Sequence, residues 1–137
     1  MKMNKKGFTL IELLAVIVIL AIIALIATPI ILGIINDARN NSKKRSAEMV
    51  STGVEYAYTT SLYNDTNGTV VTVPTLKDIK NNLNIKNMKS AELDSDATPT
   101  KLTIKTDDAV TCDVTIETKQ VKTDCGDYGS FAFSASE

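Results

Sequence analysis

Residues 5–35 read KKGFTLIELLAVIVILAIIALIATPIILGII and form the most apolar part of the chain. Between residues 13 and 35 it carries no charged side chain, and Thr28, Pro29 and Gly33 alone interrupt Leu, Ile, Val and Ala. At a rise of about 1.5 Å per residue, a helix of this length crosses the roughly 30 Å hydrocarbon core of a bilayer. The sequence therefore predicts a membrane-spanning helix near the N-terminus.

The remainder of the 137-residue chain is rich in Lys, Asp, Asn and Thr. About 75 residues follow the long N-terminal helix, so the globular core must be small. Such a core needs support from the helix or from a covalent link. We therefore expect one small head domain at residues 64–137.

Charge and composition argue against several functions. The formal net charge is −1 and becomes more negative if a leader containing Lys2, Lys5 and Lys6 is removed, which argues against a dedicated nucleic-acid surface. The chain has no His, so it lacks the commonest general base and metal ligand. We expect no enzyme activity, no cofactor and no metal site.

The N-terminal segment has two ordinary interpretations. A secretory signal peptide has an apolar region of about 7–15 residues that ends at an A-x-A cleavage site. The apolar run here is longer, no A-x-A site closes it, and Glu12 lies at its entry, so a secretory signal peptide fits poorly. A simple signal anchor would be oriented by flanking positive charges. Because four basic residues also follow the span, charge alone leaves the orientation open; they are Arg39, Lys43, Lys44 and Arg45.

The segment KKGFTLIE at residues 5–12, followed at once by the apolar run, resembles the class III signal of type IV prepilins and pseudopilins. In that family a prepilin peptidase cuts after the glycine on the cytoplasmic face and methylates the new N-terminal residue. The resemblance implies a leader of residues 1–7, cleavage between Gly7 and Phe8, and N-methylation of Phe8. It covers residues 5–36 strongly and the rest in outline.

Glu12 would be the fifth mature residue, as in the family pattern. A carboxylate in hydrocarbon costs roughly 2.5–3.5 kcal/mol on insertion scales, so it needs a partner or a function. The resemblance implies an assembly role, in which Glu12 meets the N-terminal amine of a neighbouring subunit. The alternative is a carboxylate that merely reaches the membrane edge.

Pro29 and Gly33 predict a kink in the helix. The proline lacks the N–H that would bond to the carbonyl of Leu25, and its ring crowds the preceding turn. Family members can bend or lose helical order in this region of the assembled fibre. This chain has Ala21 where many relatives have a helix-weakening glycine, so local melting is less expected here.

The helical pattern continues beyond the span. We expect one helix from about residue 8 to about residue 62, with a transmembrane and polymerisation half at 8–36 and an amphipathic half at 37–63. The predicted head-facing positions recur near helical spacing: Ile35, Ala38, Ser42, Met49, Gly53 and Ala57. The fold class is α+β, a pilin-like lollipop.

In the head, Thr75 and Asp78 predict a capped helix ending near Asn84, and a loop is expected at 94–99. Alternating apolar residues predict antiparallel strands at 102–105, 110–117 and 121–125, with a turn at Thr118–Lys119. Phe131 and Phe133 suggest a final strand or a C-terminal segment folded onto the sheet. A loop at 64–68 and an extended segment at 70–73 are also predicted.

Cys112 and Cys125 are the two cysteines of the chain. They fall on the inward face of two strands expected to pair, outside the cytoplasm, where a disulfide is favoured. Two buried free thiols or a metal pair are the alternatives, although no His is present to complete a zinc site.

The leading hypothesis is a structural subunit of a type IV pilus: a homo-oligomeric helical filament processed by prepilin peptidase and built on a pilus assembly platform. Before assembly the chain would lie in a bacterial cell membrane with its head outside the cytoplasm. The alternatives are a pseudopilin of a competence or type II secretion machine, and a minor or tip pilin acting as an adhesive module. Motility, adhesion and DNA uptake are not distinguished by the sequence.

Overall fold

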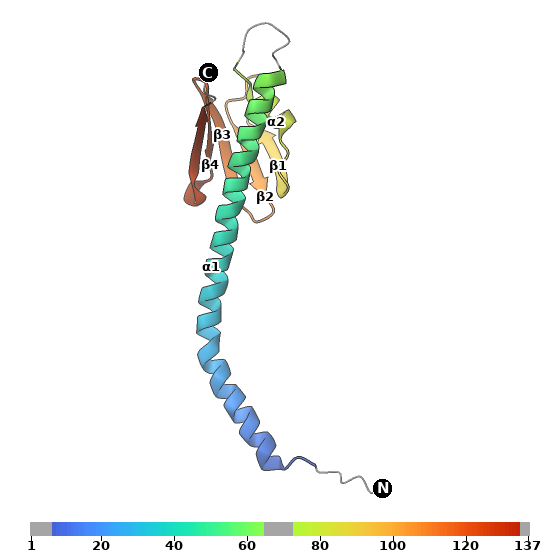
Figure 1. The fold of residues 1–137 in the computed structure, drawn as a ribbon, viewed down its shortest axis with the longest axis vertical. Coiled ribbons are helices and arrows are strands. Elements are labelled where there is room, and N and C mark those ends of the chain that lie inside the picture. The colour runs from blue at the N-terminus through green and yellow to red at the C-terminus, as the bar shows by residue number, and fades with distance from the viewer. Residues whose placement is uncertain (1–6, 65–72, 135–137) are drawn as a thin grey trace, which may run out of the picture. The chain divides into compact units, whose positions relative to one another are not determined.

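The computed structural model describes residues 7–64 and 73–134. Its longest element is helix α1, Leu10–Asn64, with 55 residues (Figure 1). The chain divides into two compact units, Met1–Arg39 and Asn40–Glu137, and α1 contributes to both. The single helix expected from about residue 8 to about residue 62 is therefore present.

The first unit consists of the apolar part of α1. Every Leu, Ile, Val and Phe side chain between residues 8 and 35 is exposed in this chain. A helix satisfies its own backbone hydrogen bonds, so an all-round apolar surface is compatible with lipid. One helix among the described residues is long and apolar enough to cross a membrane, judged by length and composition.

In the second unit, α1 buries a stripe at spacings of three and four residues. The side chains on this stripe are Ser46, Ala47, Val50, Val54, Ala57, Tyr58 and Ser61. Of the positions expected to face the head, Ala57 is buried and Gly53 is half-buried, whereas Ala38 and Ser42 are exposed and Ile35 and Met49 are each 40% exposed. That part of the prediction was wrong. The buried face of this part of α1 is instead set by its packing against the sheet and α2.

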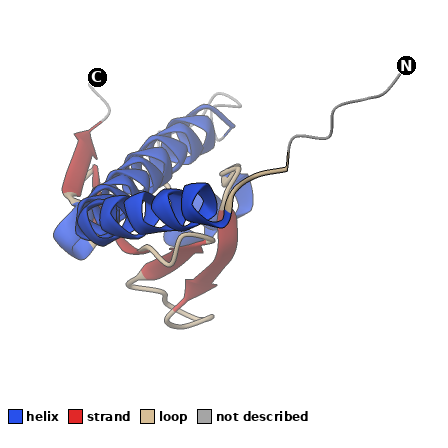
Figure 2. Cartoon of the chain, turned by 90° about the horizontal axis from the view of Figure 1, so that it is seen from below, coloured by secondary structure: helices blue, strands red, loops and turns tan. Residues whose placement is uncertain are grey.

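The second unit also contains a five-stranded antiparallel meander in the order β1-β2-β3-β4-β5. The strands are β1 Met88–Leu93, β2 Leu102–Thr106, β3 Thr111–Glu117, β4 Gln120–Asp124 and β5 Ser130–Ser134. Two short helices, α2 at Leu76–Asn82 and the 3-10 helix η1 at Gly126–Tyr128, also belong to this unit. With α1 and the strands they give the expected α+β class, visible in Figure 2 with helices in blue and strands in red.

Helix α2, Leu76–Asn82, starts as the sequence predicts. The Thr75 side chain accepts a hydrogen bond from the Asp78 amide, and the Asp78 carboxylate accepts one from the Thr75 amide at 2.9 Å. This reciprocal capping satisfies two backbone donors at the helix start. The loop predicted from residue 64 and the extended segment at 70–73 fall almost entirely on residues outside the described ranges.

Strand β1 is not among the strands predicted from the sequence. Its sequence, MKSAEL, contains Lys, Ala and Glu, which are depleted in strands. A bulge between Met88 and Ser90 also breaks the alternation of apolar and polar residues that would have revealed it. Pairing with β2 therefore creates this strand more than local preference does.

The β3–β4 hairpin turns at Thr118–Lys119, as expected. Both residues have positive φ, 44° and 72°, the pattern of the tight turns that match the twist of a hairpin. The hydroxyl of Tyr58 donates a hydrogen bond of 3.1 Å to the Lys119 carbonyl. This bond attaches the turn to α1. The turn adopts its positive φ values with Thr and Lys in place of the usual Asn and Gly.

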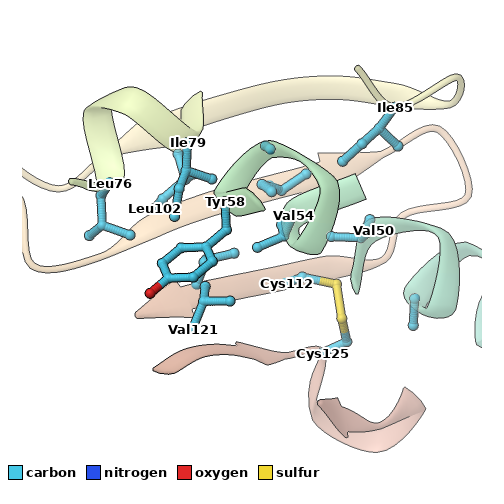
Figure 3. Packing of buried hydrophobic residues seen from close by; sticks show 14 of the residues in the cluster. Val50, Val54, Tyr58, Leu76, Ile79, Ile85, Leu102, Cys112, Val121 and Cys125 are labelled. Atoms are coloured by element: carbon cyan, nitrogen blue, oxygen red, sulfur yellow. A yellow bond between two sulfur atoms is a disulfide. The ribbon is translucent and has the colours of Figure 1, made fainter. Parts of the chain in front are cut away.

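The core lies between the second part of α1, α2 and the inner face of the sheet (Figure 3). Tyr58 is its largest fully buried side chain and meets Phe133 edge-to-face, with ring centroids 6.2 Å apart. The inward residues of β2, β3 and β4 complete it: Leu102, Ile104, Cys112, Val114 and Val121. The final strand, one of the two outcomes expected for the C-terminus, places Phe131 and Phe133 against this core.

Candidate functional site

The start of α1 is closed by Thr9 and Glu12. The Thr9 amide donates to Glu12 Oε2 at 3.0 Å, and the Glu12 amide donates to Thr9 Oγ1 at 3.4 Å. These two bonds form a capping box, which satisfies donors that a helix start leaves without intrahelical partners. This capping role was not predicted, although the T-x-x-E spacing before an apolar run is its usual signature.

Gly7 and Phe8 lie just before α1, outside any helix or strand. A Cβ added to Gly7 would meet no atom within 4 Å. The φ angle of Gly7 also lies outside the left-handed range that favours glycine. Phe8 is 91% exposed. Packing among the described residues therefore gives no reason for glycine at position 7. An exposed, non-helical bond is also the kind of backbone that proteases reach.

The apolar helix after Glu12 has no covering within its own unit. Leu25, for example, is 80% exposed, and the apolar side chains extend around the whole helix. Exposed apolar surface of this extent marks a membrane or protein interaction site. Glu12 is the sole carboxylate in the stretch from residue 8 to residue 35.

Pro29 and Gly33 lie inside α1, which continues through both as helix. The hydroxyl of Thr28 donates to the Ala24 carbonyl at 2.7 Å, a local bond that often accompanies helix bending. Gly33 has open space where a side chain would stand. The kink at these residues stays a prediction.

Cys112 and Cys125 form a disulfide, with Cα atoms 4.1 Å apart (Figure 3). Cys112 lies in β3 and Cys125 directly follows β4, and both are buried. Among the described residues no cysteine is free and no group of His, Cys, Asp and Glu could hold a metal ion. The bond therefore joins the two strands at the end opposite their turn.

A family model, the prokaryotic N-terminal methylation motif, matches residues 2–28. The chain carries the class III signal peptide of type IV pilins and pseudopilins. No curated protein and no solved structure matches the chain. The match covers about a fifth of the sequence and contains the residues Gly7, Phe8, Thr9 and Glu12 described above.

Proposed function

We propose that this chain is a pilin, the structural subunit of a type IV pilus, which is stored in a membrane and polymerised through its N-terminal helix. One observation carries the proposal: the methylation motif leads directly into a helix whose apolar residues are exposed on all sides. The signal supplies the processing step, and the helix supplies the surface that polymerises.

Processing would cut the bond between Gly7 and Phe8 and methylate the Phe8 amine. Prepilin peptidase is the partner for this step, and the assembly platform is the partner for extraction. The exposed position of the bond before α1 supports cleavage, because an extended segment fits a peptidase site more readily than a helix does. The orientation that suits this order of events has the head outside the cytoplasm.

Assembly would transfer the apolar part of α1 from lipid into a bundle of identical helices. Both environments are apolar, so the hydrophobic effect gives little net preference and van der Waals packing has to favour the bundle. Glu12 would then select register by pairing with the methylated amine of a neighbouring subunit. A buried ion pair is better suited to fixing geometry than to adding strength.

The local bond between Glu12 and the Thr9 amide bears on this assembly step. A carboxylate has two oxygens and about four acceptor positions, so Glu12 can keep its cap and still accept a second donor. Capping therefore holds the carboxylate at the helix start, in place for an incoming amine.

The experiment is to shear surface filaments from native cells and sequence the N-terminus of this protein in that fraction by mass spectrometry. An abundant chain beginning at methylated Phe8 is the expected result. If the processed chain is found in membranes and is absent from the sheared fraction, a pseudopilin or a minor subunit would be the better assignment. An N-terminus at Met1 would overturn the processing step.

A further inference from the structure

Strand β5 is one edge of the sheet and pairs with β4 on its inner side (Figure 1, dark red). Its sequence, Ser130 to Ser134, reads S-F-A-F-S and is identical in both directions. Edge strands expose unpaired backbone groups that can pair with another chain. We propose that β5 is a self-association surface, on which β5 of a second copy pairs antiparallel about Ala132.

The two edges of the sheet differ in protection. Strand β1, at the other edge, carries Lys89 and Glu92 and a bulge at its start, all of which discourage edge-to-edge pairing. Strand β5 has no charged residue, no proline and a regular register with β4 over its whole length. Within residues 7–64 and 73–134, β5 is therefore the sheet edge that lacks these protections against a partner strand.

The sequence of β5 suits a second copy of the same strand, because an antiparallel pair centred on Ala132 sets like residues opposite each other. In an antiparallel pair centred on Ala132, Phe131 lies opposite Phe133 of the second copy, and Ser130 lies opposite Ser134. Aromatic cross-strand pairs are among the stabilising ones, and no like charges meet. Phe131 and Phe133 are half-buried against the core, so part of each ring remains for such a contact.

Pairing of this kind has a defined symmetry. The two-fold axis is perpendicular to the sheet and passes between the two Ala132 residues. Rotation about this axis reverses every direction that lies in the plane of the sheet. Residues 46–61 of α1 pack along that plane, so the two copies have opposite polarity. If the chain forms fibres, a consequence that rests on the proposed function, β5 would join subunits of two antiparallel fibres. One short strand pair is weak, and repetition along fibres would strengthen it.

Cysteine cross-linking tests the register directly. The purified full chain in detergent would carry Ala132→Cys, Ser130→Cys or Ser134→Cys, each adding one thiol to a chain whose own two cysteines are bonded to each other. After mild oxidation, non-reducing gels measure the dimer fraction. Intact mass after alkylation verifies that the native disulfide is retained.

We expect A132C to form dimers by itself, because the two thiols lie opposite each other across the axis. S130C and S134C alone should form few dimers, since four residues separate like positions by about 13 Å, beyond disulfide reach. An equal mixture of S130C and S134C should restore cross-linking. Similar dimer fractions for all three single variants, or no gain on mixing, would overturn the proposal.

A second measurement avoids added thiols. Sedimentation of the full chain should show concentration-dependent association that Ala132→Lys removes, because two lysines would face each other at the axis. Gln120→Lys adds the same charge at an exposed position of the inner strand β4 and should leave association unchanged. Equal effects of the two variants would contradict β5 pairing. The test needs no filaments, so its failure is distinguishable from failure of the pilin proposal.

Discussion

Glu12 has two roles, helix capping and the proposed assembly contact, and one substitution could remove both at once. Its carboxylate caps α1 through the Thr9 amide, and the proposed assembly step uses its charge. Glu12→Gln keeps an oxygen that can accept the Thr9 amide but removes the charge, whereas Thr9→Val removes the hydroxyl acceptor and leaves the carboxylate. The three variants Glu12→Ala, Glu12→Gln and Thr9→Val therefore separate capping from assembly.

We expect Glu12→Ala and Glu12→Gln to insert in the membrane but to give little filament. Thr9→Val should lose about 1 kcal/mol of helix capping and still assemble. The measurement is the yield of sheared filament relative to processed chain in the membrane. Quantifying the processed N-terminus controls for altered cleavage. Normal filament yield from Glu12→Gln would show that the charge is not needed.

Asp94 gives the head a pH-dependent contact. Its carboxylate accepts hydrogen bonds from the Thr100 hydroxyl and from the backbone amides of Thr100 and Lys101. These bonds favour the ionised form and lower the pKa of Asp94, the Thr100 side chain contributing most. The carboxylate thereby closes the loop between β1 and β2.

Because the pKa of Asp94 is lower in the folded state, the carboxylate stabilises the fold at any pH above its unfolded-state pKa of about 3.9. This contribution is lost as the pH falls through the folded-state pKa. We predict a smaller loss of melting temperature between pH 6 and pH 3 for Asp94→Asn than for the wild type. NMR titration of the carboxyl group provides the direct measurement. A titration midpoint at or above 3.9 would contradict the assignment.

At the scale of elements, α1 packs so closely at Gly53 that a side chain does not fit. A Cβ added there would stand 2.5 Å from Cγ1 of Ile85, which lies between α2 and β1. Alanine is favoured over glycine within a helix by about 1 kcal/mol. Overpacking typically costs about 1–3 kcal/mol, and Cγ1 is not the flexible end of its side chain.

Gly53→Ala should therefore destabilise the head, by on the order of 1 kcal/mol after the gain in helix propensity. In an Ile85→Ala background the clash is absent, and the same substitution should become neutral or stabilising. Urea unfolding followed by tyrosine fluorescence measures all four members of this double-mutant cycle. A cost of Gly53→Ala that persists without Ile85 would place the strain elsewhere.

At the scale of the whole molecule, the small head depends on the disulfide. The bond closes a loop with a sequence separation of 13, for which the chain-entropy model gives about 3 kcal/mol. Total stabilities of domains are about 5–15 kcal/mol, so this is a large share. Replacing both Cys112 and Cys125 by Ala should lower the free energy of unfolding by about that amount.

Urea unfolding with and without reductant is the measurement. The wild type should lose stability in reductant, and the double variant should be insensitive to it. Two alkylated cysteines in the native protein without reductant would show that the bond is not formed in the natural environment. Equal stability of the oxidised and reduced wild type would show that the sheet holds the strands without it.

Features that depend on local chemistry could be predicted from the amino-acid residues. Four features depend on residues that are neighbours in the chain: the processing motif, the apolar span, the Thr75–Asp78 cap and the turn at Thr118–Lys119. Three features emerge from the folded structure: the face of α1 that is buried, the formation of β1 by MKSAEL, and the close approach of Gly53 to Ile85. These features depend on contacts between residues distant in the chain. The position of the S-F-A-F-S strand at an open edge is of the same kind, because strand order follows from the pairing of the whole sheet.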